Sequence, residues 1–488
     1  MSNNSLGGGS LKRSLNPMHV WAIAFGCVIG WGSFVNPGKK FLPNSGVAGT
    51  AIAMILGALV MIIIAFSYAY MVPKYPKAGG EFTFTKMCFG KNAAFLCGWF
   101  LVAAYLTNVP MNSTAIGLIV DGIDGSADIL KFGFHYTIAG FDVWMGEMIL
   151  AMGILILFGW LNIIGVQKAA IVQTILSSLL VVSAVTLCIT GLVSPKATGI
   201  NMQPIWGFDK SAAMAAGATT ETISEYAHTG TAGIMSAILA TFAIAPWAYV
   251  GFDAIPQAAE EFNFSFKKVS FIMMIAIIFG CFVYTSNNTV AAAALANWPD
   301  RVMAGEWVVL VAAEELLGGF GKVLIGVGVS CAVLSGIMGF YLASSRLMYS
   351  MAREGYLPKW FGVINPKYGT PQNAMIFCVI FSLSGPILGR EALGWFVDMC
   401  AIGASIGYFF TSASTLVSIK RDGDGTPFLK AMAITGVVFS VAFMILQLVP
   451  IPGLSGVHFG TESYILLVVW IVLGLIFYFR ERKFFTAG

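Results

Sequence analysis

Charged residues are scarce in this sequence. Asp, Glu, Lys and Arg make up 10% of its 488 residues, whereas 58% of the residues are hydrophobic. A soluble globular protein carries about 25% charged residues. A chain so poor in charge could not cover its own surface with polar groups in water, but a surface that faces lipid should be apolar. The composition therefore excludes an ordinary soluble domain and indicates an integral membrane protein.

Several site classes have no support in the sequence. The net charge is only +4, and no basic run is typical of a nucleic-acid patch. The eight cysteines lie mostly in apolar stretches and none falls in a CxxC or other metal-ligand spacing. The four histidines are scattered as well. We therefore expect free thiols without disulfides, no metal site, no cofactor and no nucleic-acid partner.

The sequence also predicts neither a nucleotide-binding loop nor a cleaved signal peptide. The segment from Gly32 to Lys39 resembles a phosphate loop, but five residues separate Gly32 from Gly38 and Lys40 follows Lys39 where the motif has Ser or Thr. Residues 1–10 are polar and glycine-rich, and no short apolar segment with a cleavage site follows them. Transport driven by a nucleotide site on this chain and a cleaved leader are both unexpected.

Long apolar stretches fill most of the chain. A membrane-spanning helix needs about 20 mostly apolar residues, and by that rule we predict about twelve spans. A short stretch around Arg390 and Glu391 separates the ninth from the tenth. The expected limits of the spans are 18–39, 47–72, 92–121, 143–164, 168–193, 231–260, 267–295, 320–350, 373–389, 393–418, 428–449 and 463–480.

The loops predict the orientation. Lys and Arg are about twice as frequent in the even-numbered connections and the two termini as in the odd-numbered ones, which places both termini in the cytoplasm. We expect a multi-pass protein of the cell membrane. The longer outer loops are then 194–230 and 296–319, and the second holds a surface helix from Arg301 to Leu317.

Two spans are interrupted. The first contains Gly26, Gly30 and Gly32, and the sixth contains Pro246 followed by Gly251. Glycine and proline weaken a helix interior. Paired interruptions in corresponding places of two halves are the best sequence indication of a binding site at mid-membrane depth. Because the breaks lie five spans apart, we predict two five-helix repeats of inverted topology, followed by two further helices.

This interpretation divides the chain into five parts. They are a cytoplasmic N-terminal tail (1–17), a first repeat (18–193), an extracellular loop (194–230), a second repeat (231–418) and the last two spans with a cytoplasmic C-terminus (419–488).

The breaks predict a chemistry. Freed N–H groups near Gly30, Trp31 and Gly32 begin a half-helix, whose positive dipole end attracts a carboxylate. Freed carbonyls can accept hydrogen bonds from an ammonium group. They are expected at Val28, Trp247, Ala248 and Val250. A zwitterion fits this arrangement without a charged side chain, in agreement with the scarcity of charge.

Four motifs in order resemble those of the amino acid–polyamine–organocation superfamily of permeases. The first is Gly26, Ile29, Gly30, Gly32 and Phe34 in the pattern G-x-x-I-G-x-G-x-F. The others are PKAGGEF at 76–82 with Phe89-Gly90 and Gly98-Trp99, Gly251-Phe252-Asp253 with Glu260-Glu261, and a series from Ser345-Arg346 through Arg353-Glu354-Gly355 and Leu357-Pro358 to Gly369-Thr370-Pro371. Together they extend along most of the chain.

The resemblance implies the inverted-repeat fold of leucine-transporter-like proteins and transport of amino acids or amines by alternating access. Carried over by position, it puts the substrate carboxylate at Trp31 and Gly32, with Ile29 and Gly30 beside them. It puts the substrate amine at Val28, Trp247 and Val250, with Ala248 and Gly251 beside them, and makes Trp247 the aromatic that closes the occluded state.

Two positions depart from the family pattern. Trp31 stands where many relatives have Ser or Ala, so a pocket-facing indole would require a smaller or differently placed substrate. Leu180 stands where several relatives carry a lysine that replaces a sodium ion. The coupling mode therefore stays open between protons, sodium, exchange and none.

Other polar groups within the spans have functional and structural interpretations. Tyr105, Asn108 and Asn112 could face the pocket or bond between helices, and Ser335 could be a ligand for an ion or a packing residue. Asp398 could carry a proton or lie near the interface. Glu260 and Glu261 also have two interpretations. They could form a latch with Arg346, or they could lie at a helix end exposed to solvent.

The leading hypothesis is a secondary transporter, symporter or exchanger, for an amino acid. The first alternative is a permease for a small amine such as ethanolamine or a polyamine, which would need an acidic group in the pocket. A membrane enzyme would need converging His, Asp, Glu or Cys residues, and none converge in the sequence. A channel would need a polar lining, which the apolar spans do not offer, whereas a transporter-like receptor would bind its ligand without net uptake. The identity of the substrate, the direction of transport, the oligomeric state and a partner subunit stay open.

Overall fold

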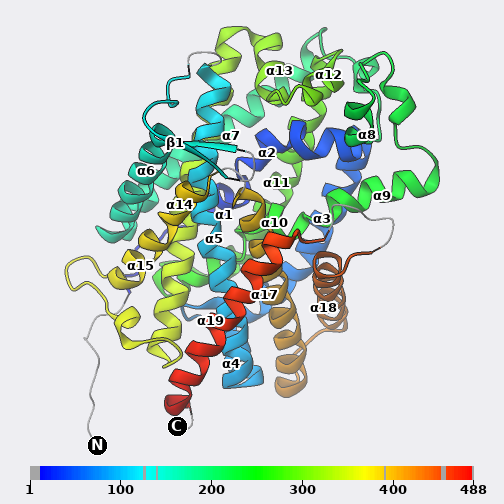
Figure 1. Ribbon diagram of the computed structural model, residues 1–488. Coiled ribbons are helices and arrows are strands. Elements are labelled where there is room, and N and C mark those ends of the chain that lie inside the picture. Colours follow the sequence, from blue (N-terminus) through cyan, green and yellow to red (C-terminus); the bar gives the residue numbers. More distant parts are fainter. Residues whose placement is uncertain (1–10, 125–127, 139–140, 390–391, 452–457, 486–488) are drawn as a thin grey trace, which may run out of the picture.

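The long apolar stretches form helices in the computed structural model, which describes residues 11–124, 128–138, 141–389, 392–451 and 458–485 (Figure 1). Within these ranges ten helical segments are long and apolar enough to cross a membrane. The first of them, Pro17–Lys74, holds two of the expected spans. The expected ninth span corresponds to the shorter apolar segment Gln372–Leu388. The all-α membrane architecture is thus confirmed, while Arg390 and Glu391 lie outside the described residues.

Within the described ranges, helices follow one another with one pair of strands between them. In order, the elements are α1 (Pro17–Val28), α2 (Gly32–Asn36), the π-turn η1 (Pro37–Phe41), α3 (Leu42–Lys74), α4 (Gly80–Phe89), α5 (Lys91–Asp124), β1 (His135–Ile138), β2 (Phe141–Trp144), α6 (Met145–Ile163), α7 (Val166–Val193), η2 (Gly199–Met202), α8 (Lys210–Ala215), η3 (Ile223–Tyr226), α9 (Gly230–Phe242), α10 (Ala245–Tyr249), η4 (Ile255–Glu261), α11 (Phe266–Ala294), α12 (Trp298–Met303), α13 (Val308–Leu317), α14 (Gly319–Arg353), η5 (Lys359–Gly362), α15 (Gln372–Ser382), α16 (Ser384–Leu388), α17 (Ala392–Asp422), α18 (Pro427–Leu448) and α19 (Thr461–Phe485), all within the described ranges.

Helices suit this sequence because lipid offers no hydrogen bonds to a backbone, so each spanning segment must satisfy its own N–H and C=O groups. Local signals mark where helices begin. Asn16 caps α1 by accepting a hydrogen bond from the His19 amide at 2.9 Å, and Thr426 caps α18 through the Leu429 amide at 3.1 Å. Each cap is followed by a proline at the first helical position, where its missing N–H costs nothing.

Both expected interruptions are present. The helix α1 ends at Val28 and α2 begins at Gly32, so Ile29 to Trp31 connect two separate helical pieces. In the sixth expected span, α9 ends at Phe242, α10 ends at Tyr249, and the chain resumes as the 3₁₀ segment η4 at Ile255. Gly251 sits in this second break with φ +128°, a backbone conformation that favours glycine.

The expected surface helix from Arg301 to Leu317 is instead two helices, α12 and α13. The chain turns at Gly305, whose φ is +78°. Residues other than glycine rarely adopt that backbone conformation, and it is incompatible with a continuous α-helix from α12 into α13. The Trp307 side chain then anchors the start of α13 to α2, because its Nε1 donates to the Phe34 carbonyl at 2.7 Å.

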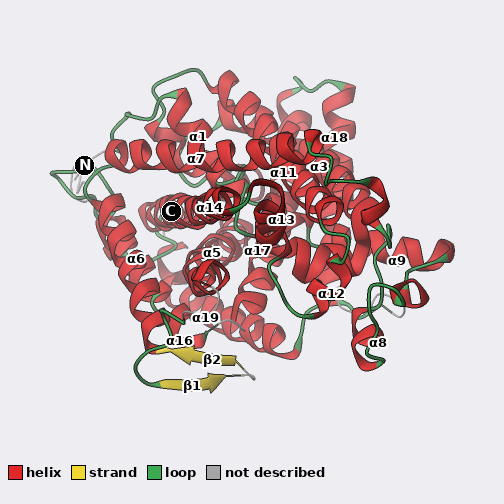
Figure 2. Cartoon of the chain, turned by 90° about the horizontal axis from the view of Figure 1, so that it is seen from above, coloured by secondary structure: helices red, strands yellow, loops and turns green. Residues whose placement is uncertain are grey.

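A small antiparallel sheet lies at the margin of the bundle, as the view from above shows (Figure 2). Its strands β1 and β2 pair His135 with Trp144 and Ile138 with Phe141. The rings of His135 and Trp144 stack with centroids 4.2 Å apart. This hairpin precedes α6 and takes no part in the two helix breaks.

The helical bundle has two different ends. At one end, the amides of Ser14 and Leu15 donate to the Glu261 carbonyl at 3.0 Å, and Tyr478 of α19 donates to the Asn92 side chain at the start of α5. The beginning of α1 and the end of α19 therefore lie at the same end as α4, which we call the α4 end (Figure 1). The helices α12 and α13 cover the opposite end, which we call the α13 end.

Candidate functional site

The two helix breaks meet at a small cavity in the middle of the bundle, which we call the inner cavity. Its volume is about 20 Å³, roughly enough for one water molecule. The helices α1, α5, α10, α11 and α14 and the two breaks contribute to its wall. The lining residues are Cys27, Val28, Gly30, Trp31, Asn108, Met111, Asn112, Trp247, Ala248, Val250, Tyr284, Gly336 and Phe340.

One side of the inner cavity offers backbone donors. The amides of Ser33, Phe34 and Val35 already donate to the carbonyls of Gly30 and Trp31 at 3.0–3.1 Å. By contrast, within the described chain no backbone hydrogen bond is donated by residues 30 to 32. These free N–H groups lie at the first turn of α2, where the partial positive charge of a helix start favours an anion.

The other side offers backbone acceptors, although fewer than the sequence predicts. In the part of the chain that the structure describes, the carbonyls of Val28, Ala248 and Val250 accept no backbone hydrogen bond. The Trp247 carbonyl, in contrast, accepts one from the Val250 amide at 3.3 Å, so that carbonyl is occupied by the turn itself. The donors and acceptors stand on opposite helix ends, as a zwitterion requires.

Two tryptophans fill most of the space between the breaks. The rings of Trp31 and Trp247 meet edge to face with centroids 6.2 Å apart, and both side chains are buried. A Cβ on Gly32 would collide with the Trp247 ring, so Gly32 allows the indole to close over the cavity. The inner cavity is therefore small because the indole rings of Trp31 and Trp247 fill the space between the breaks. Gly32 allows the Trp247 ring to approach because it has no side chain.

Two buried polar atoms at the cavity wall lack partners in the structure. They are Trp31 Nε1, a donor, and Asn112 Oδ1, an acceptor. Asn112 comes close to α14 because Gly336 has no side chain, and a Cβ there would lie 2.8 Å from Oδ1. A buried polar atom without a hydrogen bond is costly, so both atoms are suited to meet a polar ligand.

The structure places the ten residues predicted for substrate binding in two groups. Those that line the inner cavity are Val28, Gly30, Trp31, Trp247, Ala248 and Val250. Those that do not are Ile29, Gly32, Gly251 and Tyr105; Ile29 and Gly251 belong to the breaks, and Gly32 is the first residue of α2. The Tyr105 hydroxyl points elsewhere, to Glu81 Oε1 at 3.2 Å and Asp253 Oδ2 at 3.0 Å.

Several lining residues were not predicted as binding residues. They are Cys27, Met111, Tyr284, Gly336 and Phe340. Tyr284 and Phe340 lie on α11 and α14, whose apolar composition gives no sequence signal for one face over another. Asn108 and Asn112, for which a pocket-facing orientation was one of two interpretations, both line the cavity.

Three other predicted positions lie apart from the inner cavity. Ser335 Oγ donates to the Gly26 carbonyl at 3.2 Å, which ties α14 to α1. Leu180 is fully buried in α7. Asp398 accepts a hydrogen bond from Ser463 Oγ at 2.6 Å, between α17 and α19. No group of three or more His, Cys, Asp or Glu residues among those described could hold a metal ion.

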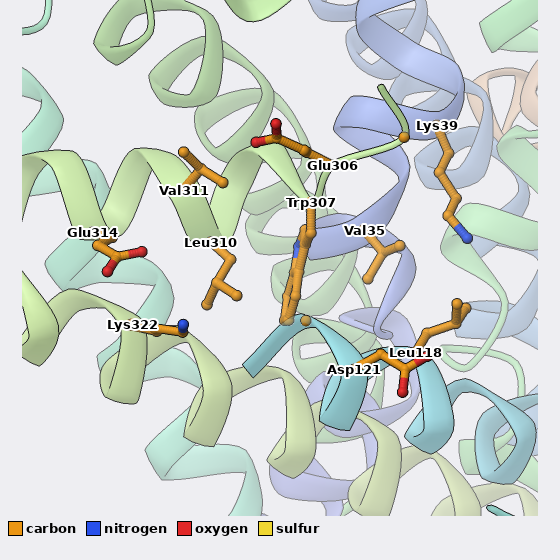
Figure 3. Close-up of a pocket in the computed structure, with 12 residues that line it drawn as sticks. Val35, Lys39, Leu118, Asp121, Glu306, Trp307, Leu310, Val311, Glu314 and Lys322 are labelled. Atoms are coloured by element: carbon orange, nitrogen blue, oxygen red, sulfur yellow. The ribbon is translucent and has the colours of Figure 1, made fainter. Parts of the chain in front are cut away.

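A larger cavity opens toward the α13 end, and we call it the outer pocket (Figure 3). Its volume is about 410 Å³, and Val35, Leu310 and Trp307 form an apolar part of its wall. Its remaining wall carries both signs of charge. The charged lining residues are Lys39, Asp121, Glu306, Glu314 and Lys322. The short helix α2 lies between this pocket and the inner cavity, since Trp31 borders one and Val35 the other.

At the α4 end the bundle is closed by ion pairs. Arg346 Nε donates to Glu261 Oε1 at 2.8 Å, and both side chains are at most 1% exposed. Arg353 donates to both oxygens of Glu260 at 2.6 and 3.0 Å, nearer the surface. Burial acts to raise the pKa of Glu260, but the hydrogen bonds and charge of Arg353 outweigh it and hold that pKa below its usual value. We call these two pairs the latch.

Comparisons with known proteins show what the chain is similar to. The family model described as "Amino acid permease" matches residues 15–477. An uncharacterized transporter of Rhizobium meliloti is 26% identical over 98% of this chain and 94% of its own length. The branched-chain amino acid permease BcaP of Bacillus subtilis is 24% identical over 97% of this chain and 94% of its own. The large neutral amino acids transporter small subunit 2 of Homo sapiens is 28% identical over 77% of this chain, which spans 64% of that relative.

Proposed function

Because the chain belongs to the amino acid permease family, we propose that it carries a small neutral amino acid across the cell membrane by alternating access, as a symporter or exchanger. The protein is a multi-pass membrane transporter and not an enzyme. The observation that carries the proposal is the inner cavity itself, which forms where the two helix breaks meet. The names of the relatives, which refer to large neutral and branched-chain amino acids, support an amino acid as the substrate. A small one is favoured because the Trp31 and Trp247 rings leave only about 20 Å³ in the inner cavity.

In this proposal the substrate carboxylate binds the free amides of residues 30 to 32 and the ammonium group binds the carbonyls of Val28, Ala248 and Val250. Each interaction uses a backbone N–H or C=O group that has no hydrogen-bond partner within a helix and that lipid cannot bond. Substrate binding therefore supplies the hydrogen bonds that these groups lack in the empty site. The side chain of the substrate then lies against Trp31 and Asn112, whose polar atoms lack partners.

The structure corresponds to an occluded form with an outward-facing vestibule in this proposal. The outer pocket is the vestibule on the extracellular side, and the latch closes the cytoplasmic side, where both termini lie. Release inward requires Glu261 and Arg346 to separate and the inner cavity to open toward α4. A cavity of about 20 Å³ must also expand to admit a substrate, and the Trp31 and Trp247 rings are the groups that have to move.

The amine alternative has less support. A substrate without a carboxylate would need an acidic side chain in the wall of the cavity, and the described wall has none. Two buried carboxylates, Asp253 and Glu81, are not among the lining residues of the cavity and instead accept the Tyr105 hydroxyl. We therefore retain the amino acid as the substrate.

Counterflow in proteoliposomes tests this function. Vesicles are loaded with one unlabelled amino acid at a time, and entry of its labelled form is measured against empty vesicles. We expect saturable counterflow with small neutral amino acids and its loss in Trp247→Ala. Trp160→Ala is the matched control, because Trp160 is 53% exposed on α6. Counterflow with amines alone, or with no compound, would contradict the proposal.

A further inference from the structure

The wall of the inner cavity holds one hydrogen-bond donor and one acceptor that are not used. Among the described residues, neither Trp31 Nε1 nor Asn112 Oδ1 has a hydrogen-bond partner. The Trp31 side chain is 5% exposed and the Asn112 side chain is 2% exposed, so water outside the bundle does not bond to them. Buried polar groups in native proteins are nearly all hydrogen-bonded, and an unpartnered pair at a cavity therefore indicates a ligand that bonds to both.

The orientation of the Asn112 amide follows from α5. Its Nδ2 donates to the Asn108 carbonyl at 2.7 Å, one turn earlier in the same helix. The reverse orientation would set Oδ1 against that carbonyl oxygen, so Oδ1 is the end of the amide that is left for a ligand. This oxygen lies beside Gly336 of α14, where a Cβ would approach it to 2.8 Å. Because Gly336 has no side chain, the acceptor stays uncovered.

The Trp31 indole supplies the donor from the other side. Its ring meets the Trp247 ring edge to face with centroids 6.2 Å apart, and an indole nitrogen can donate but not accept. In the proposed binding mode, the free amides of residues 30 to 32 take the substrate carboxylate and the free carbonyls of the breaks take the ammonium group. The indole N–H and the Asn112 oxygen are left over, so they face the side chain of the substrate.

A group that satisfies both atoms must accept from an N–H and donate to an oxygen. A hydroxyl group does both, whereas a methyl group does neither, a carboxylate has no proton to donate and an ammonium group cannot accept. A carboxamide also does both, but it has three heavy atoms. The inner cavity has a volume of about 20 Å³, roughly that of one water molecule, and a hydroxyl group is a single heavy atom with similar hydrogen-bonding capacity.

We propose that the transported amino acid carries a side-chain hydroxyl group, of which serine is the smallest example. The hydroxyl oxygen accepts from Trp31 Nε1, and the hydroxyl hydrogen is donated to Asn112 Oδ1. The proposal rests on the transport function above and names the substrate class of the same site. It makes Trp31 and Asn112 the residues that determine specificity for the side chain.

The proposal predicts an order among three amino acids that differ by one group. Serine satisfies both atoms. Alanine leaves a space that one water molecule fills, and this water satisfies them as well. In α-aminobutyrate a methyl group stands in place of the hydroxyl, so it displaces the water and leaves both atoms without partners. Serine should therefore bind best and α-aminobutyrate worst, whereas an apolar pocket would prefer α-aminobutyrate to alanine because it buries one more methyl group.

Binding is measured in two ways. Inhibition of labelled alanine counterflow in vesicles gives the relative affinities of the three amino acids. The rise in Tm of the purified protein in detergent, measured at increasing concentrations of each amino acid, gives the same order without requiring transport. In wild type, serine should bind at least about tenfold more tightly than α-aminobutyrate, because the second compound leaves two buried groups unpaired.

The variants are Trp31→Phe and Asn112→Leu. Each replaces a side chain by a similar one that lacks the polar atom, so each removes one of the two hydrogen bonds. We expect each to lower the ratio of the serine and α-aminobutyrate affinities several-fold. The matched control is Trp160→Phe, on the 53% exposed Trp160 of α6, which should keep the wild-type ratio. Since the two variants remove different bonds, either one tests the proposal if the other does not fold.

Three results would overturn the inference. If α-aminobutyrate competes as well as serine in wild type, the pocket does not recognise a hydroxyl group, and normal alanine counterflow in the same vesicles would leave the transport function intact. An unchanged ratio in both variants would mean that the hydroxyl group is bound by other residues. If no amino acid raises the Tm of wild type or supports counterflow, the transport function and the hydroxyl site are wrong together.

Discussion

The indole rings of Trp31 and Trp247 face each other edge to face across the inner cavity, with centroids 6.2 Å apart. One ring comes from the connection between α1 and α2, and the other comes from α10. The size of the cavity therefore depends on residues from both broken helices, and neither helix alone determines which substrates fit.

Trp31→Ala should widen the range of substrates. Removal of the indole leaves space beside the free amides of residues 30 to 32, so larger side chains such as that of leucine should fit. The measurement is inhibition of labelled alanine counterflow by amino acids of increasing size. We expect leucine to become an effective competitor, and Trp160→Ala should leave the order of competitors unchanged. An unaltered order in Trp31→Ala would place the substrate elsewhere.

Gly32→Ala should reduce transport strongly. A Cβ at this position would collide with the Trp247 ring, and forcing an extra methyl group into a packed site costs about 1–3 kcal/mol. If closure of the Trp247 ring is needed in each cycle, the rate of counterflow should fall about tenfold. Gly153→Ala on α6 is the control, because nothing lies within 4 Å of a Cβ there. Equal rates in the two variants would show that Trp247 need not approach Gly32.

Arg346→Ala should destabilise the protein far more than Arg353→Ala. The first change leaves Glu261 buried without its partner, which typically costs about 3–5 kcal/mol. The second change breaks a pair whose arginine side chain is 36% exposed, and such pairs contribute about 0–1 kcal/mol. Thermal unfolding in detergent should show a clear fall in Tm for Arg346→Ala alone. Similar falls for both variants would contradict the buried character of the inner pair.

The Glu81 carboxyl predicts a pH dependence of stability. Its pKa is raised from 4.5 to about 8 in the folded protein, so the folded state binds more protons than the unfolded state between these values. Its stabilising contribution is fully present below the unfolded pKa and is lost as the pH rises through the folded pKa. The Tm of wild type should decrease from pH 5 to pH 8 by more than the Tm of Glu81→Gln, since the amide does not titrate. Parallel curves would mean that Glu81 is ionised when folded.

The fold and part of the site could be predicted from the sequence for clear reasons. Lipid forces apolar stretches into helices, and the glycines and proline at 26–38 and 246–256 mark the backbone that does not continue as a helix. The family was correctly identified from four motifs along the chain, of which those at 26–34 and 251–261 overlap the two breaks. The break in the predicted surface helix was missed because a single glycine, Gly305, is compatible with a helix until its φ is known.

The remaining part of the site depends on tertiary packing. Tyr105 lies about one helical turn from Asn108 on nearly the same face of α5, so its displacement along the helix axis brings it to Glu81 and leaves it out of the cavity wall. Glu81 itself belongs to a motif, but nothing in the motif shows that the side chain is fully buried, since α5, α17 and η4 provide its surroundings. Tyr284 and Phe340 come from helices whose apolar pattern is uniform, so only the structure shows which face meets the breaks.

The helix α14 extends from the outer pocket past the inner cavity to the latch. The 35 residues of α14 continue without a break, which corresponds to a rod of about 50 Å. Lys322 on this rod borders the outer pocket, Gly336 borders the inner cavity and Arg346 holds the latch. A rigid rod that pivots near its middle moves its two ends in opposite directions, as a seesaw does. A tilt of α14 about Gly336 would therefore narrow the outer pocket while it separates the latch, or the reverse. A single helix would then prevent the inner cavity from being open to both sides of the membrane at once.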